Sequence, residues 1–114
     1  MSINFVTADY LLEINQQYLK HNYHTDIITF NYSGSTDNLD GELFISVHEA
    51  MANALKYKVN VDNELLRLVI HGILHLIGFD DKQPNEKKKM KVEENKLTTL
   101  FEKKYKNILI AYDY

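Results

Sequence analysis

The most regular hydrophobic pattern in the chain lies at residues 64–77, where apolar side chains occupy nearly every position around a predicted helix. A helix that is apolar on all sides is buried in the protein interior. Asp62 is expected to cap its N-terminus, and Gly78 can end it because glycine adopts a left-handed backbone without strain. The apolar residues of this segment are Leu65, Leu66, Leu68, Val69, Ile70, Ile73, Leu74, Leu76 and Ile77.

Shorter patterns predict three strands and three further helices. Alternating or β-branched residues indicate strands, and apolar residues at helical spacing indicate helices. The predicted strands are residues 2–6, 25–32 and 41–46, with a turn-rich loop at 33–40. The predicted helices are residues 8 to about 20, 47 to about 56 and 84 onward, followed by a short apolar tail at 107–114.

Local signals mark where these helices begin. Thr7 is expected to cap the first, Ser46 and Glu49 to form a capping box for the second, and Pro84 to occupy the first turn of the last. The residues expected to face inward are Leu11, Ile14, Tyr18, Met51, Ala54, Leu55, Met90, Leu97, Leu100 and Phe101. These patterns predict one domain over residues 1–114 with an α+β fold, in which helices cover a small mixed β-sheet.

Two histidines on the buried central helix are spaced to hold a metal ion. His71 and His75 are four residues apart, which places both imidazoles on one face of a helix. A turn at Gly78 is expected to bring Asp81 back toward them. Two histidines and one carboxylate leave room for water, as in catalytic zinc sites. The alternative is that both histidines are core residues that form hydrogen bonds with the backbone.

The same spacing matches the metal-binding helix of metzincin proteases, with two differences. Gly72 occupies the position of the glutamate general base, and Asp81 occupies that of the third histidine. Peptide hydrolysis is therefore not expected, because the proton acceptor is missing. Gly72 is expected to let another structural element or a substrate approach the helix closely.

The composition indicates the cellular compartment and excludes some types of metal ligand. The 114 residues include no cysteine, so a disulfide-linked partner and thiolate metal ligands are excluded. The N-terminal residues lack the pattern of a signal peptide, and the apolar segment at 65–77 is too short to span a membrane. We therefore expect a cytoplasmic protein that does not interact with a membrane.

Charge is distributed unevenly along the chain. The net charge is −3, but residues 82–106 hold nine lysines and four acidic residues and so carry +5. An acidic protein can still hold phosphates on a local basic face. The alternative is that these lysines form only a solvated helix face.

Three segments together resemble the YbeY family of bacterial rRNA maturation factors. They are T-D-I-I-T-F at 25–30, G-E-L-F-I-S at 41–46 and H-G-I-L-H-L-I-G-F-D-D at 71–81. The resemblance implies an α+β metalloprotein that is a zinc-dependent, single-strand-specific endoribonuclease in 16S rRNA 3′-end maturation and ribosome quality control. It also implies rRNA and the small ribosomal subunit as partners. The implied cofactor is one Zn²⁺ per chain, held by His71, His75 and Asp81.

The chain departs from the family pattern at four places. Asp81 replaces a third histidine ligand, and Asn31 replaces a proline. The arginine that often follows the Gly-Glu strand is absent, and so are an additional N-terminal strand and helix. The only arginine of the chain is Arg67, one helical turn before His71.

We hypothesise that zinc lowers the pKa of bound water toward ~7, so that the water attacks phosphorus or acts as a base for the RNA 2′-hydroxyl. The predicted catalytic residues are His71, His75 and Arg67. Asp80 either orients a ligand imidazole or serves only in the turn. The residues expected to hold RNA phosphates are His48, Lys82, Lys87, Lys88, Lys89 and Lys91.

Two other functions are compatible with the sequence. The protein could be a ribosome-associated RNA-binding factor in which the metal is purely structural, or a metal-dependent hydrolase of a small substrate. A saturated four-ligand metal site would favour the structural role. An exchangeable water in an open cleft would favour an enzyme.

Overall fold

The computed structural model describes residues 1–34 and 40–112, with side chains as far as residue 103. Its strands are β1 (Ser2–Val6), β2 (Ile27–Asn31) and β3 (Gly41–Ser46). Its helices are α1 (Ala8–Leu19), α2 (Val47–Tyr57), α3 (Val61–Leu76) and α4 (Pro84–Tyr112). The predicted loop at 33–40 falls mostly on residues 35–39, which lie outside the described residues.

The three strands form one mixed sheet with β3 in the centre. β1 pairs with β3 in parallel, from Ser2 opposite Glu42 to Val6 opposite Ser46. β2 pairs with β3 in antiparallel orientation. The predicted α+β class and small mixed sheet are therefore confirmed.

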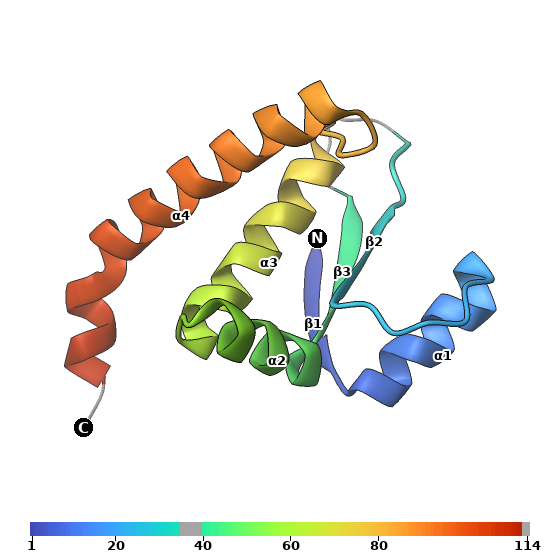
Figure 1. Ribbon diagram of the computed structural model, residues 1–114, viewed down its shortest axis with the longest axis horizontal. Coiled ribbons are helices and arrows are strands. Elements are labelled where there is room, and N and C mark those ends of the chain that lie inside the picture. Colours follow the sequence, from blue (N-terminus) through green and yellow to red (C-terminus); the bar gives the residue numbers. More distant parts are fainter. Residues whose placement is uncertain (35–39, 113–114) are drawn as a thin grey trace.

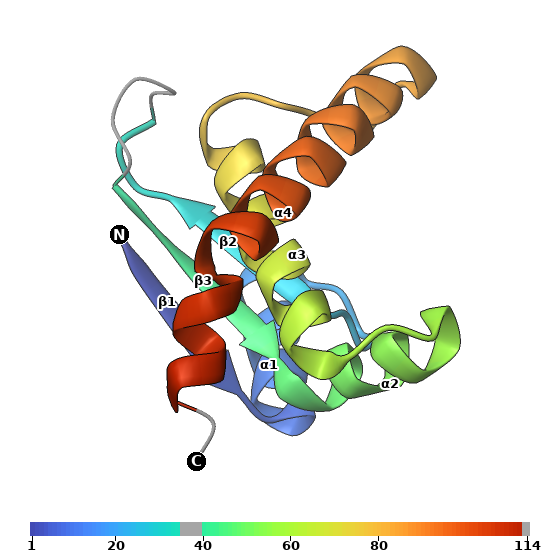
Figure 2. The same cartoon turned by 90° about the vertical axis from the view of Figure 1, so that its left-hand side faces the viewer.

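Helices cover both faces of this sheet, because successive strand residues point to opposite sides. Ile28, together with the partly buried Phe30 and Phe44, packs against Leu11 and Ile14 of α1. On the other face, the core cluster includes Ile27 and Ile45 of the sheet and Leu65, Leu68 and Val69 of α3. Figures 1 and 2 show α3 lying between the sheet and α4.

α4 completes the burial of α3 from the side away from the sheet. Met90 packs with Ile70 and Leu74, and Leu97 lies partly buried against the same cluster. Asn63, near the start of α3, donates a hydrogen bond to Glu102 of α4. The central helix therefore has a partner on both sides, as its apolar pattern predicts.

Most of the predicted helix starts are confirmed. Thr7 accepts a hydrogen bond from the Tyr10 amide, and Ser46 accepts one from the Glu49 amide. Pro84 is the first residue of α4. The prediction for α3 is wrong, because Asn60 rather than Asp62 caps it and accepts from the Asn63 amide. Both are good capping residues, so the sequence alone does not distinguish them.

Several residues predicted to face inward are exposed instead. Met51 and Leu55 are 49% and 82% exposed, because α2 packs through Ala50 and Ala54. Leu100 is 56% and Phe101 40% exposed, although both follow the spacing of Met90 and Leu97. α4 also continues through the predicted tail to Tyr112, so the helix is longer than predicted.

Gly72 lets α3 approach the sheet closely. A Cβ atom on Gly72 would lie 2.8 Å from a methyl of Leu43 and 2.9 Å from a methyl of Ile27. The close neighbour that the sequence predicts at Gly72 is therefore the sheet. This contact sets the distance between the sheet and the helix that carries both histidines.

We expect Gly72→Val to lower the free energy of unfolding by about 1–3 kcal/mol, because the added methyl groups overlap Leu43 and Ile27. Leu43→Ala opens space at the same contact. The double variant should therefore be less destabilised than the sum of the two single variants, by roughly 0.5 kcal/mol or more, in urea unfolding. Strictly additive effects would contradict this packing.

Candidate metal centre

The turn after α3 determines where Asp81 lies. Gly78 has φ +108°, a conformation that side-chain-bearing residues rarely adopt. The amide of Gly78 donates to the His75 carbonyl and that of Phe79 to the Leu74 carbonyl, which is the Schellman pattern of a helix end. The chain reverses at this point and brings Asp81 back alongside His71 and His75.

The three predicted ligands come together. Asp81 Oδ2 lies 3.5 Å from His75 Nε2 and 3.8 Å from His71 Nε2. One ligand atom from each of the three residues lies within 4.8 Å of the others. Four ligands about 2.0–2.2 Å from a tetrahedral zinc ion lie roughly 3.4 Å from one another, so these separations fit a single ion.

In both histidines the Nδ1 atom contacts a group other than Asp81, so that only Nε2 faces the candidate metal position. His75 Nδ1 lies 3.1 Å from the Phe79 carbonyl oxygen. A carbonyl can only accept, so His75 carries its proton on Nδ1 and turns the Nε2 lone pair toward Asp81. His71 Nδ1 lies 2.8 Å from Glu94 Oε2. The two Nε2 atoms and the Asp81 carboxylate oxygen thus face one another. They are too far apart for normal hydrogen bonds, and this arrangement could hold a cation between them.

Charges around His71 favour a positive centre. The hydrogen bond with Glu94 raises the pKa of His71 more than burial lowers it, and Asp81 raises it further. Burial raises the pKa of Glu94, but its hydrogen bond with His71 and the nearby positive charges outweigh this and hold the pKa below its ordinary value. The two carboxylates therefore favour the positively charged form of His71 or a bound cation at this place.

Arg67 lies beside this group and contacts three side chains. Its Nη1 atom is 2.9 Å from Glu94 Oε1 and 3.3 Å from Asn95 Oδ1. Its Nε atom is 3.8 Å from Glu64 Oε1. Burial raises the pKa of Glu64, and the charge of Arg67 opposes that effect.

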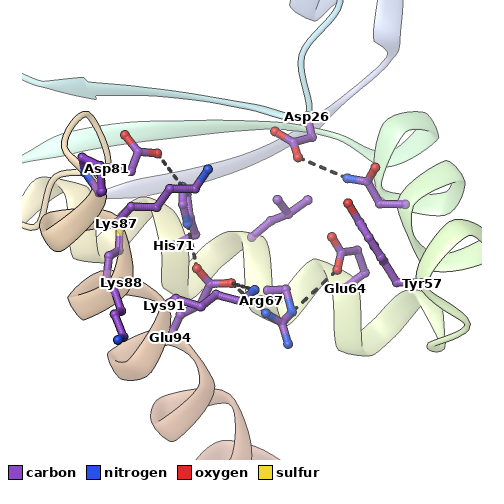
Figure 3. Close-up of a pocket in the computed structure, with 14 residues that line it drawn as sticks. Asp26, Tyr57, Glu64, Arg67, His71, Asp81, Lys87, Lys88, Lys91 and Glu94 are labelled. Carbon is purple, nitrogen blue, oxygen red and sulfur yellow. Dashed lines mark hydrogen bonds and ion pairs between the residues drawn. The ribbon is translucent and has the colours of Figure 1, made fainter.

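His71 and Asp81 line a pocket of about 710 Å³ to which residues of α2, α3 and α4 contribute. His75 instead lines a smaller pocket together with both of them. Figure 3 shows Lys87, Lys88 and Lys91 coming from α4 on the Asp81 side, with Glu64 and Tyr57 on the opposite side. In the part of the chain that the structure describes, Lys87 and Lys88 form no ion pair, whereas Lys91 Nζ lies 3.6 Å from Glu94 Oε1. Lys87 and Lys88 therefore offer a phosphate two ammonium groups without an ion-pair partner at the lining of this pocket.

The other predicted RNA-binding residues are distributed over different surfaces. His48 lines a separate groove with Phe5 and Met51. Lys89 lines two grooves on another side of α4, and Lys82 is exposed in the loop before α4. The structure does not bring these three residues together with the metal ligands, and their binding of RNA stays a prediction.

Asp80 occupies the turn rather than contacting an imidazole. Its Oδ1 accepts hydrogen bonds from the amides of Asp81 and Lys82. The carboxylate that contacts a ligand imidazole is Glu94, which the sequence analysis missed. The available signal was its position on the apolar face of α4, four residues after Met90 and three before Leu97.

Residues just before and within β2 also contribute to the site and were not predicted to do so. Thr25, Asp26 and Thr29 line a small pocket with His71, His75 and Asp81. Asp26 also lines the larger pocket, where it accepts a hydrogen bond from Asn53. The Thr-Asp segment was recognised only as a marker of resemblance, because nothing in its periodicity shows which element it faces.

The fold and site define an α+β protein with three candidate metal ligands on a central helix and its following turn. Residues 1–102 match the family described as Endoribonuclease YbeY. The chain therefore belongs to the YbeY family.

Individual relatives agree with this assignment. A protein named Endoribonuclease YbeY from Phocaeicola vulgatus is 48% identical over 84% of this chain and 69% of its own length. Proteins of the same name from Bacteroides thetaiotaomicron and Karelsulcia muelleri are 49% and 45% identical, over 81% and 90% of this chain and 66% and 74% of theirs. The chain thus spans about two thirds of the length of these relatives.

A solved structure shares the fold. The solution structure of TM1509 from Thermotoga maritima superimposes with a TM-score of 0.69 and 28% sequence identity. The match covers 92% of this chain and 69% of that chain.

We expect the protein to bind about one Zn²⁺ per chain, and His71→Ala or His75→Ala to abolish that binding, because each removes one of three ligands. Metal analysis after dialysis measures this. His48→Ala is the matched control, since it removes a helical histidine from a separate groove. Full metal content in the His71→Ala/His75→Ala double variant would rule this site out.

Asp81 has its own test. Asp81→Ala should weaken metal binding in a chelator competition, and Asp81→His should restore or strengthen it, because an imidazole can replace the carboxylate as third ligand. Asp81→Asn keeps the shape but removes the charge, and so separates coordination from packing. Equal affinity in the native and Asp81→Ala proteins would show that Asp81 is not a ligand.

Proposed function

We propose that this protein is a zinc-dependent endoribonuclease that cleaves single-stranded RNA and acts in 16S rRNA 3′-end maturation and ribosome quality control. The observation that carries the proposal is an open three-residue metal site beside a pocket with free lysine ammonium groups. The name Endoribonuclease YbeY on relatives that share 45–49% identity supports the same reaction.

The shape of the site supports catalysis rather than a structural role for the metal. Structural zinc sites are closed by four protein ligands, whereas catalytic sites keep a position open. Within the described residues only one group of three metal-binding side chains is found. The side chains of His71, His75 and Asp81 are 26%, 27% and 43% exposed, so solvent can reach all three of them.

In this proposal, each group of residues in the site has a separate role in the reaction. When bound at His71, His75 and Asp81, a Zn²⁺ ion supplies a Lewis acid that acidifies water and withdraws charge from a phosphoryl oxygen. Lys87 and Lys88 would hold phosphates of the RNA backbone, which orients the scissile bond over the ligands. The pocket also holds the acidic residues Asp26 and Glu64, which repel phosphates and favour neutral parts of a nucleotide.

Partners and location follow from this proposed reaction. The substrate would be rRNA of the small ribosomal subunit, and the reaction would take place in the cytoplasm, where ribosomes are assembled. Among the helices that the structure describes, none is long and apolar enough to cross a membrane.

The decisive experiment is a cleavage assay on a single-stranded RNA and on the same sequence as a duplex. Zinc-loaded protein should cut the single strand, a chelator should stop the reaction, and added Zn²⁺ should restore it. His75→Ala is the inactive control. Zinc-loaded protein that binds the single strand without cutting it would instead indicate an RNA-binding factor with a structural metal.

The lysines that line the pocket should contribute RNA affinity. In Lys87→Gln/Lys88→Gln, the slope of log affinity against log salt should fall by about 0.7 for each lost phosphate contact. The matched control is Lys96→Gln/Lys103→Gln, which removes the same charge from exposed positions of the same helix outside the pocket. Equal slopes in both double variants would show that Lys87 and Lys88 belong only to a solvated helix face and do not contact RNA phosphates.

A further inference from the structure

The only arginine of the chain, Arg67, contacts two protein carboxylates. Arg67 contacts Glu94 at 2.9 Å and Glu64 at 3.8 Å, and both acidic side chains are about 5% exposed. Two buried carboxylates therefore balance one guanidinium, whose side chain is 29% exposed. A phosphate that approached Arg67 would have to compete with both.

Glu94 uses both of its oxygens. Oε1 accepts from Arg67 and lies 3.6 Å from Lys91 Nζ, while Oε2 lies 2.8 Å from His71 Nδ1. Burial of a carboxylate is costly unless it is paired and hydrogen-bonded, and here every contact is with a donor. The carboxylate is consequently fixed in place between α3 and α4.

We infer that Arg67 and Glu94 are positioning residues, which act as a chain Arg67–Glu94–His71 that holds the His71 imidazole for the metal. The inference rests on the metal site of the proposed function. The Glu94 carboxylate keeps the proton of His71 on Nδ1 and directs Nε2 toward Asp81 and His75. Arg67 fixes the orientation of that carboxylate and does not bind the RNA phosphate.

The two histidines are held in different ways. The orientation of the His75 ring depends on the Phe79 carbonyl, which lies four residues later and is fixed by the turn at Gly78. His71 depends on a side chain of α4, 23 residues away in sequence. Metal binding is therefore coupled through His71 to the docking of α4 on α3.

The test measures metal affinity rather than cleavage. Glu94→Gln keeps the shape of the side chain but exchanges an acceptor-only carboxylate for an amide, so Zn²⁺ affinity in a chelator competition should fall 10- to 100-fold. Glu93→Gln is the matched control, because it removes the same charge from the next residue of α4, which faces another groove. Its Zn²⁺ affinity should equal that of the wild type.

Arg67 variants separate positioning from phosphate binding. Arg67→Gln should weaken Zn²⁺ affinity in the same direction and leave the salt slope of RNA binding unchanged, and Arg67→Lys should recover part of the metal affinity. A normal Zn²⁺ affinity together with a reduced salt slope in Arg67→Gln would overturn the inference. So would a folded Glu94→Gln protein with wild-type Zn²⁺ affinity.

One measurement needs no variant and therefore does not depend on the folding of one. In the zinc-loaded wild type, long-range ¹H–¹⁵N spectra of the histidine rings should show His71 protonated on Nδ1. A proton on Nε2 of His71 would overturn the inference. Absence of RNA cleavage with normal zinc binding would reject the nuclease and leave this positioning role intact.

Discussion

The central constraint of this structure is that α3 is buried on two sides and still carries polar side chains. The sheet covers one side and α4 the other. Glu64, Arg67, His71 and His75 lie on this helix, and a polar group in such a position is stable only with a partner. No buried side-chain nitrogen or oxygen in the described residues lacks a hydrogen-bond partner. The need for hydrogen-bond partners explains why the polar side chains of α3 contact one another and the polar residues around them.

This constraint connects the fold to the metal centre. Gly72 sets the approach of α3 to the sheet, so its position also sets where the neighbouring His71 lies. Gly78 ends the helix and supplies the geometry in which the Phe79 carbonyl engages His75. α4 supplies the remaining partner through Glu94. The sheet, the turn after α3 and helix α4 thus each have a direct role in orienting a candidate ligand.

Features that depend on residues close together in the sequence were predictable from the sequence. The spacing of His71 and His75, the helix end at Gly78 and the return of Asp81 depend on local backbone geometry, which a few residues determine. The caps Thr7 and Ser46 were predictable for the same reason. The start of α3 was not, because Asn60 and Asp62 are both capable of capping and only the packed structure selects between them.

The sequence by itself predicted the grouping of His71, His75 and Asp81, the elements that carry them and the mixed α+β character of the fold. Only the tertiary structure decided that Glu94 contacts His71, that Arg67 is occupied by carboxylates, and that Lys87 and Lys88 share the pocket with the ligands while His48 does not. It also decided that Leu55 and Leu100 are exposed. The physical reason is that periodicity shows which face of an element is apolar, whereas the partner of a side chain depends on how distant elements pack.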